Sequence, residues 1–287
     1  MNNMLPAEQW MRAAALAVCG FAQVAVMSSA LAQTTSAPLL IDTHIHYSHD
    51  AWELLPPPKA LEVLRAAGLK RAFVSSSSDQ GTQKLYALAP DFIVPVLRPY
   101  RARGEISSWA NDESVIPMLT QLLQTNRYAG IGEFHAYDAD IELPVLQAVI
   151  ELAQQHKIFL HAHSDADAVK RIFAKNAEAI VLWAHSGFDD PGVIREMLKN
   201  YPNLWSDLAF RSEHHNGAVV APEWRSLFVD FPTRFVLGTD TFAPERWHYV
   251  QDNANENRAW LAKLPGSLAV RIASQNALDL LARTSFR

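Results

Sequence analysis

Residues 41–46 read Ile-Asp-Thr-His-Ile-His, an apolar, strand-like run that ends in two metal-ligand side chains. Four later segments end in the same way: residues 130–133 (Gly-Ile-Gly-Glu), 159–163 (Phe-Leu-His-Ala-His), 181–185 (Val-Leu-Trp-Ala-His) and 236–240 (Val-Leu-Gly-Thr-Asp). In a barrel of alternating strands and helices, the C-terminal ends of all strands meet at one rim, so residues remote in sequence become neighbours there. The sequence therefore predicts a (β/α)8 TIM barrel, an α/β fold, with a polar site at that rim.

The spacing of these segments supports the barrel. The intervals between His46, Glu133, His163, His185 and Asp240 correspond to three, one, one and two strand-helix units of roughly 22 to 30 residues, as expected when about 250 residues form eight units. The segments are thus assigned to strands 1, 4, 5, 6 and 8. Between them, short apolar runs alternate with helical segments, which is the pattern of buried parallel strands.

The other elements follow from the same alternation. The remaining strands are expected at residues 71–75, 92–97 and 203–208, and residues 212–221 are expected to form a loop. Helices are expected at residues 59–67, 79–89, 111–125, 142–156, 165–175, 191–200 and 222–229, with two more at 255–264 and 267–284 that close the chain.

Composition indicates a folded globular protein whose substrate, if small, is not a polyanion. The chain has 287 residues, 49% hydrophobic and 19% charged, which is enough for one large domain. Its net charge of -5 provides no basic footprint, so neither nucleic acid nor a polyanionic substrate is favoured. Nothing in the composition determines the oligomeric state, and a homo-oligomer stays open.

The N-terminal 32 residues read as a secretory signal peptide. Residues 13–30 are almost wholly apolar after Arg12, and Ala30-Leu31-Ala32 has the small-x-small pattern of a cleavage site. An uncleaved membrane anchor or a buried helix are the alternatives. Cleavage would leave residues 33–287 as the barrel, secreted or periplasmic and without a stable membrane anchor. The only cysteine, Cys19, would leave with the signal, so a metal site must use nitrogen and oxygen ligands.

The candidate metal ligands differ in how firmly their positions define a role. His44 and His46 are two residues apart on a strand, so their side chains face the same way and form a bidentate pair suited to Zn²⁺, Mn²⁺ or Fe²⁺. Asp240 follows Gly238-Thr239 at the end of strand 8, where a carboxylate can bind the metal and accept a proton from its water. The alternative for Asp240 is a cap for the following helix.

The middle strands contribute candidates with more than one reading. On strand 5, His163 lies nearer the rim and is preferred as the ligand, whereas His161 is either a hydrogen-bonded histidine just below it or the ligand itself. His185 could bind a second metal or orient the substrate. Glu133 could bridge two metals or act as an acid or base, and its alternative is a partner for a nearby arginine. His135 shares the face of Glu133 and remains an ambiguous neighbour.

This ordered set resembles the amidohydrolase superfamily, specifically its amidohydrolase-related branch, over nearly the whole chain after the signal. The segment from residue 130 to Glu133 is also similar to the strand 4 segment of TatD-type hydrolases. The resemblance implies a centre of one or two metals, with His44, His46, His163 and Asp240 in the metal shell and His185 as a second-metal ligand or substrate contact. This chain has no lysine at the strand 4 position, so a carboxylated-lysine bridge is not available there.

Together these features predict a metal-dependent hydrolase that uses a metal-activated water to cleave an amide, ester or lactone bond in a small molecule. One or two divalent ions are expected, with Zn²⁺ first and Mn²⁺ or Fe²⁺ as alternatives. Asp240 would move the proton, and His185 would stabilise the developing oxyanion. Arg98 and Arg211 could bind a substrate carboxylate or serve as surface salt-bridge arginines. The alternatives are a non-hydrolytic decarboxylase of the same superfamily and an inactive metal-binding barrel.

Overall fold

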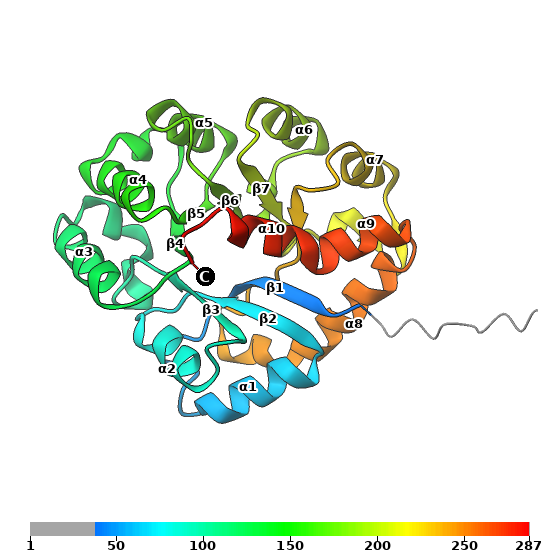
Figure 1. The fold of residues 1–287 in the computed structure, drawn as a ribbon, viewed down its shortest axis with the longest axis horizontal. Helices are drawn as coiled ribbons and strands as arrows, with labels where there is room; N and C mark the ends of the chain where they lie inside the picture. The colour runs from blue at the N-terminus through cyan, green and yellow to red at the C-terminus, as the bar shows by residue number, and fades with distance from the viewer. Residues whose placement is uncertain (1–37, 287) are drawn as a thin grey trace, which may run out of the picture. The chain divides into compact units, whose positions relative to one another are not determined.

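The computed structural model describes residues 38–286, and within that range the chain forms a barrel of eight parallel strands (Figure 1). Neighbouring strands pair in the order β1-β2-β3-β4-β5-β6-β7-β10. A bridge between Asp42 and Leu237 joins the last strand to the first and closes the barrel. The strands are β1 (Leu40–Ile45), β2 (Leu69–Val74), β3 (Ile93–Leu97), β4 (Gly130–His135), β5 (Phe159–His163), β6 (Val181–Trp183), β7 (Leu204–Asp207) and β10 (Phe235–Val236).

Helices surround the strands in a ring, which confirms the predicted (β/α)8 TIM barrel (Figure 1). Each connecting helix turns an apolar face to the sheet; Val149 and Ile172, for example, are fully buried. The helices are α1 (Pro57–Ala66), α2 (Gln80–Leu88), α3 (Val115–Thr125), α4 (Pro144–His156), α5 (Ala166–Lys175), α6 (Pro191–Asn200), α7 (Pro222–Asp230), α8 (Val250–Leu261), α9 (Gly266–Val270) and α10 (Asn276–Ala282).

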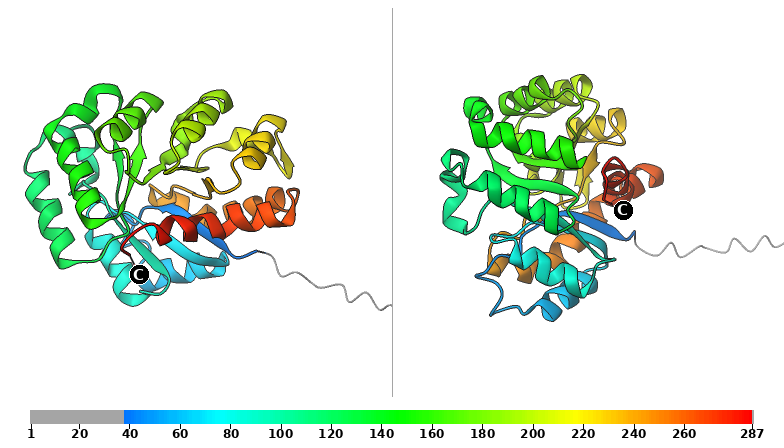
Figure 2. Two further views of the ribbon diagram at one scale, coloured as in Figure 1. Left: turned by 45° about the horizontal axis from the view of Figure 1, so that its top comes forward. Right: turned by 60° about the vertical axis from the view of Figure 1, so that its left-hand side comes forward.

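The interior of the barrel is a separate apolar core, and α10 closes one end of it. Ile41, Phe73, Phe159 and Val236 are among the inward-facing strand residues, and they form one buried cluster with residues of α10 such as Leu280. Figures 1 and 2 show α9 and α10 lying across that end of the barrel. The opposite end, where the strands finish, is therefore the end left for polar side chains.

The expected strand assignments agree with the structure: the five ligand-bearing segments are the first, fourth, fifth, sixth and eighth barrel strands. The prediction of a plain loop at residues 212–221 was incomplete, because a short antiparallel pair forms there, β8 (His215–Asn216) and β9 (Val219–Val220). Gly217, with a φ of 55°, adopts the left-handed conformation that such a tight turn needs.

The closing segment also differs from the prediction. Residues 267–284 were expected to be one helix, but α9 and α10 are separated by a π-helical turn at Arg271–Gln275. Immediately after this turn, the Asn276 side chain donates to the carbonyl oxygens of Pro232 and Phe235 and so attaches the start of α10 to the last barrel strand.

The predicted signal peptide, residues 1–32, lies outside the residues that the structure describes. Among residues 38–286, no helix combines the length and the apolar character needed to cross a membrane.

Candidate metal centre

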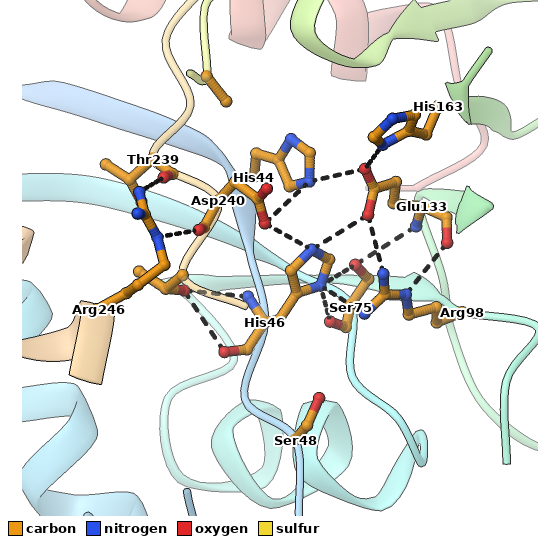
Figure 3. A network of polar contacts seen from close by, with 12 residues as sticks. His44, His46, Ser48, Ser75, Arg98, Glu133, His163, Thr239, Asp240 and Arg246 are labelled. Atoms are coloured by element: carbon orange, nitrogen blue, oxygen red, sulfur yellow. Dashed lines mark hydrogen bonds and ion pairs between the residues drawn. The ribbon is translucent and has the colours of Figure 1, made fainter. Parts of the chain in front are cut away.

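All eight barrel strands bring a polar side chain to the same rim, at or just after their C-terminal ends. Figure 3 shows part of this cluster, with His44, His46, Glu133, His163 and Asp240 labelled. These side chains are buried or nearly so, although they carry charge or strong hydrogen-bonding groups. Such groups are rarely buried together unless they bind one another or a ligand. In chain order they are His44 and His46, Ser75, Arg98, Glu133, His161 and His163, His185, Asp207 and Asp240.

Three buried atoms at the centre of this cluster have no hydrogen-bond partner among the described residues. They are Nε2 of His44, Nε2 of His46 and Oδ1 of Asp240. Oδ1 of Asp240 lies 3.2 Å from Nε2 of His46 and 3.7 Å from Nε2 of His44. Two imidazole nitrogens and a carboxylate oxygen are a donor set suited to Zn²⁺, Mn²⁺ or Fe²⁺. These three residues, all predicted ligands, therefore fit a divalent metal.

The second ring nitrogen of each histidine is held by the surrounding protein. Nδ1 of His44 lies 3.0 Å from Oδ2 of Asp207, and Nδ1 of His46 lies 2.6 Å from the carbonyl oxygen of Ser75. In the neutral ring, these acceptors hold the proton on Nδ1, so Nε2 keeps its lone pair towards the centre. The protein thus selects the tautomer that a metal requires.

Glu133 occupies the middle of the cluster and contacts most of its members (Figure 3). Its Oε1 lies 3.4 Å from Nε2 of both His44 and His185, and its Oε2 lies 3.3 Å from Nε2 of His46. Burial raises the pKa of Glu133, but the charge of His44 and hydrogen bonds from His163 and His185 outweigh it and lower the pKa well below its usual range. Glu133 is therefore an anion facing the predicted ligands.

Two further contacts to Glu133 bear on its alternative reading. Arg98 donates from NH2 to Oε2 of Glu133 at 2.9 Å and from Nε to its carbonyl oxygen at 3.2 Å. The arginine partner that the sequence left open thus exists, in addition to the histidine contacts. Gly132 makes the approach of this strand possible: its φ is 136°, and a Cβ there would lie 2.2 Å from the carbonyl oxygen of His161.

The two histidines of β5 have different surroundings. His163 places Nδ1 at 2.8 Å from Oε1 of Glu133, and together with His135 these residues form a second group able to hold a cation. His161 lies deeper, with Nε2 at 3.1 Å from Oδ2 of Asp207. Burial lowers the pKa of His161 to about 4. His161 is thus hydrogen-bonded below the rim, but with His44 and Asp207 it also forms a group able to hold a cation, so the choice between His161 and His163 as the ligand stays a prediction.

His185 is held rigidly at the end of β6. Its backbone N–H donates to Oδ1 of Asp207 at 2.8 Å, and its Nδ1 lies 3.0 Å from the carbonyl oxygen of Ala209. With a φ of 54°, His185 adopts the left-handed conformation that is unfavourable for a residue with a Cβ. Its Nε2 is directed to Oε1 of Glu133 and Oδ2 of Asp240, at 3.4 and 3.8 Å.

The two predicted substrate-binding arginines are placed differently. Arg98 is buried beside Glu133 and lines the cavity at the mouth of the centre. Arg211 is also buried, but it donates to the carbonyl oxygens of His185 and Asp189, at 3.1 and 2.7 Å. Arg211 therefore braces the loop after β6 through backbone carbonyl oxygens, and it does not line the cavity at the mouth of the centre.

Asp207, at the end of β7, is a site residue that the sequence prediction did not name. Its two carboxylate oxygens accept from His44, His161 and the backbone N–H groups of His185 and Ala209. Burial raises its pKa, but the charge of His44 and hydrogen bonds from the two histidines reverse this effect and lower it. A signal for Asp207 was available, because residues 204–207 (Leu-Trp-Ser-Asp) end a strand in a carboxylate as the other site segments do.

Asp240 is positioned by its neighbours at the junction of β1 and β10. Asp42 accepts from the Thr239 hydroxyl at 2.6 Å and from the backbone N–H groups of Thr239 and His44. Arg246 donates to the carbonyl oxygens of Asp240 and Thr239, at 2.6 and 2.9 Å (Figure 3). These contacts hold the Asp240 backbone at a φ of 48°, another left-handed position.

A cavity of about 240 Å³ opens directly onto Glu133, His163 and Asp240. Arg98, Tyr100, Arg103, His135 and Phe242 are among its lining residues. A concave site with a few convergent polar groups is the usual form of a small-molecule pocket.

Comparison with known proteins agrees with the fold. No protein-family model matches the chain, and no curated protein sequence matches it. A probable 2-pyrone-4,6-dicarboxylic acid hydrolase from Acinetobacter baumannii superposes with a TM-score of 0.58 at 13% identity, over 85% of this chain and 99% of that one. A TIM-barrel protein of unknown function from Bordetella bronchiseptica gives 0.56 at 15% identity, over 79% and 82% of the two chains.

A TatD-family hydrolase from Entamoeba histolytica gives a TM-score of 0.55 at 11% identity, over 84% of this chain and 98% of that one. At such low identity these similarities establish the fold. The hydrolases among these neighbours belong to the amidohydrolase superfamily, which is the superfamily that the sequence motifs resemble. Fold and site together define a TIM barrel with buried His, Asp and Glu clusters that suit a divalent metal.

Proposed function

We propose that this protein is a metal-dependent hydrolase that cleaves an amide, ester or lactone bond in a small molecule. The observation that carries the proposal is the convergence of three unpartnered buried atoms, from His44, His46 and Asp240, beside a cavity of about 240 Å³. The hydrolase names of several proteins with this fold support the same reading.

His44, His46 and Asp240 would hold the metal, with Glu133 and His185 next to it. When bound, a divalent metal lowers the pKa of a coordinated water from about 16 towards about 7 and polarises a carbonyl group. We propose Zn²⁺ as the metal, with Mn²⁺ or Fe²⁺ as substitutes. The second group, Glu133 with His135 and His163, offers a place for a second ion.

The chain's own residues would move the proton and stabilise charge. Asp240 has one oxygen free of hydrogen bonds at the centre, so its carboxylate can accept a proton from the attacking water and return it to the leaving group. Nε2 of His185, on the other side of Asp240, can donate to the oxygen that becomes negative as the carbonyl is attacked. The Ala209 carbonyl and Asp207 keep His185 in place for this role.

Replacement of Asp240 by asparagine tests the proposal. Asparagine keeps an oxygen ligand but cannot accept the proton, so turnover should fall by about 100-fold or more while the metal is largely retained. The purified protein and the variant would be compared by elemental analysis and by hydrolysis of a panel of esters, lactones and N-acyl compounds in ¹⁸O-labelled water. Asp167→Asn, which changes an exposed aspartate paired with Lys170, is the matched control.

Two outcomes would contradict the hydrolase. One is protein that contains no divalent metal and does not respond to added Zn²⁺ or Mn²⁺, which would also exclude a simple metal-binding barrel. The other is release of CO₂ without incorporation of ¹⁸O, which would assign the non-hydrolytic decarboxylase instead.

A further inference from the structure

Three phenylalanines stand half exposed around the mouth of the metal centre. Phe188, Phe210 and Phe242 are 56%, 42% and 43% exposed, and they lie in the segments that follow β6, β7 and β10. We call them the aromatic arc. Scattered apolar side chains are normal on a surface, but these three rings are joined by ring contacts to His185 and to one another, and Phe242 also lines the cavity at the metal centre.

The aromatic arc is continuous with the candidate catalytic residues. The Phe188 ring is stacked on the His185 ring, with 4.6 Å between centroids and 18° between planes. The Phe210 ring lies 5.8 Å from His185 and 5.9 Å from Phe242. Phe242 lies two residues after Asp240 and lines the same cavity as Glu133. A group attached to a carbonyl held at Nε2 of His185 would therefore meet these rings.

The conformation of the arc argues against a purely structural role. Phe188 and Phe210 have φ values of 54° and 56°, in the left-handed region that bulky side chains avoid. Asparagine or glycine would adopt this backbone more easily, and burial returns little for rings that remain half exposed. Unfavourable backbone that displays an aromatic ring at a site mouth is typical of a residue retained for binding.

Arg246 holds two rings of the arc in position. Its guanidinium carbon lies 4.1 Å from the Phe210 ring centroid and 5.5 Å from that of Phe242. The same guanidinium donates to the backbone of Thr239 and Asp240, so the arc and the metal-binding carboxylate share one support. Rings that are fixed before binding lose less freedom when a ligand stacks on them.

Polar side chains line the same cavity as Phe242. Arg98, Arg103 and His135 line it, and the Tyr100 hydroxyl accepts from the His135 backbone at 2.7 Å and donates to its Nδ1 at 2.9 Å. The cavity therefore combines an aromatic ring with hydrogen-bonding groups beside the predicted metal ligands.

We infer that the substrate carries a flat apolar group, above all an aryl ring, next to the bond that is cleaved, and that the aromatic arc binds this group. This inference rests on the proposed function, because a substrate presupposes an enzyme. The binding preference itself does not depend on turnover. The site would accordingly favour aryl esters, amides or lactones over aliphatic compounds with the same reacting group.

The test compares two probes that share a carboxylate, 2-naphthoate and acetate, by calorimetric titration of the metal-loaded protein. Wild type should bind 2-naphthoate at least about tenfold more tightly than acetate. Phe188→Asn and Phe210→Asn should each weaken 2-naphthoate binding about five- to tenfold, the usual worth of one stacked ring, and leave acetate binding unchanged. Tyr249→Ala, at an aromatic side chain that is 59% exposed and outside the arc, should change neither.

Thermal unfolding of the same variants separates binding from packing. Because asparagine suits a left-handed φ, Phe188→Asn and Phe210→Asn should melt at the same temperature as wild type or higher. Lower melting temperatures, equal losses for both probes, or unchanged 2-naphthoate binding would each overturn the inference. Failure of the hydrolase is distinguishable, because it appears as missing turnover with the 2-naphthoate preference intact.

Discussion

Asp207 connects the histidines of the centre to one another at the residue scale. One of its oxygens serves the rings of His44 and His161, and the other serves the backbone of His185 and Ala209. All four contacts come from donors, so only a full carboxylate satisfies them without reorganisation. Buried partners of this kind orient a metal ligand and set which of its nitrogens carries the proton.

Asp207→Asn should lower metal affinity by about 10- to 100-fold. If the asparagine oxygen keeps the backbone contacts, its amide donates to Nδ1 of His44, and the ring proton must then move to Nε2, the atom that faces the metal. Affinity would be measured by competition with a chromogenic chelator, with circular dichroism to confirm folding.

Asp79→Asn is the matched control for that experiment. It changes a buried aspartate outside the metal centre, whose Oδ2 accepts from the Tyr128 hydroxyl. Equal metal affinity in wild type and Asp207→Asn would show that Asp207 does not set the tautomer of His44.

At the scale of the elements, the segments that follow β6, β7 and β10 share a residue with a left-handed backbone conformation. His185, Phe210 and Asp240 each adopt a left-handed φ, at 54°, 56° and 48°. Asp207 accepts from the backbone N–H of His185, and Arg211 and Arg246 donate to the carbonyl oxygens of His185 and Asp240, which holds two of the three positions. Non-glycine residues in this region cost about 1 kcal/mol or more each, and such positions concentrate at functional sites.

Helix α2 offers a prediction about stability that is separate from the metal centre. Asp79 precedes the helix and is buried, and its Oδ2 accepts from the Tyr128 hydroxyl at 2.7 Å. Burial raises the pKa of Asp79 from 3.8 to about 6. Between roughly pH 4 and pH 6 the folded protein therefore binds a proton that the unfolded chain does not, so this group's stabilising contribution is present at low pH and is lost as the pH rises through about 6.

Asp79→Asn should remove that dependence while it keeps an oxygen for the Tyr128 hydroxyl. Relative to wild type, the variant should gain about 1 kcal/mol in free energy of unfolding between pH 5 and pH 7.5. Urea unfolding at the two pH values measures the difference. Parallel changes in both proteins would mean that Asp79 is already ionised at pH 5.

The whole molecule divides stability and function between the two ends of the barrel. The interior core and α10 fill the end where the strands begin, and they contain no member of the metal centre. The polar cluster fills the end where the strands finish. Because eight strands converge there, each supplies one or two side chains, and no single segment has to carry the whole site.

The N-terminal segment completes the account of the whole chain as a proposal. We expect export to a secreted or periplasmic location, with cleavage after Ala32, because small residues occupy positions 30 and 32 behind an apolar run. N-terminal sequencing of the exported protein should begin at Gln33. Replacement of Ala32 by arginine should block processing. Full-length wild-type protein that stays in the cytosol would contradict the proposal.

Much of the fold was determined by local sequence. Short apolar runs, separated by amphipathic helices of regular length, leave few arrangements other than a parallel barrel. The ligand pairs were visible for the same reason: a polar side chain at the end of a buried strand has few roles except at the rim, and His44 with His46 shows the period of two that places both on one face.

Contacts between residues far apart in the sequence were decided only by the tertiary structure. Sequence could not show that Arg98 pairs with Glu133 whereas Arg211 braces the backbone of His185, since both are arginines that follow a strand. Three other features likewise depend on the closed barrel. They are the deeper placement of His161, the contacts of Asp207 with residues of three other strands, and the grouping of Phe188, Phe210 and Phe242. Closure brings these side chains together, and no local pattern records which neighbours they will meet.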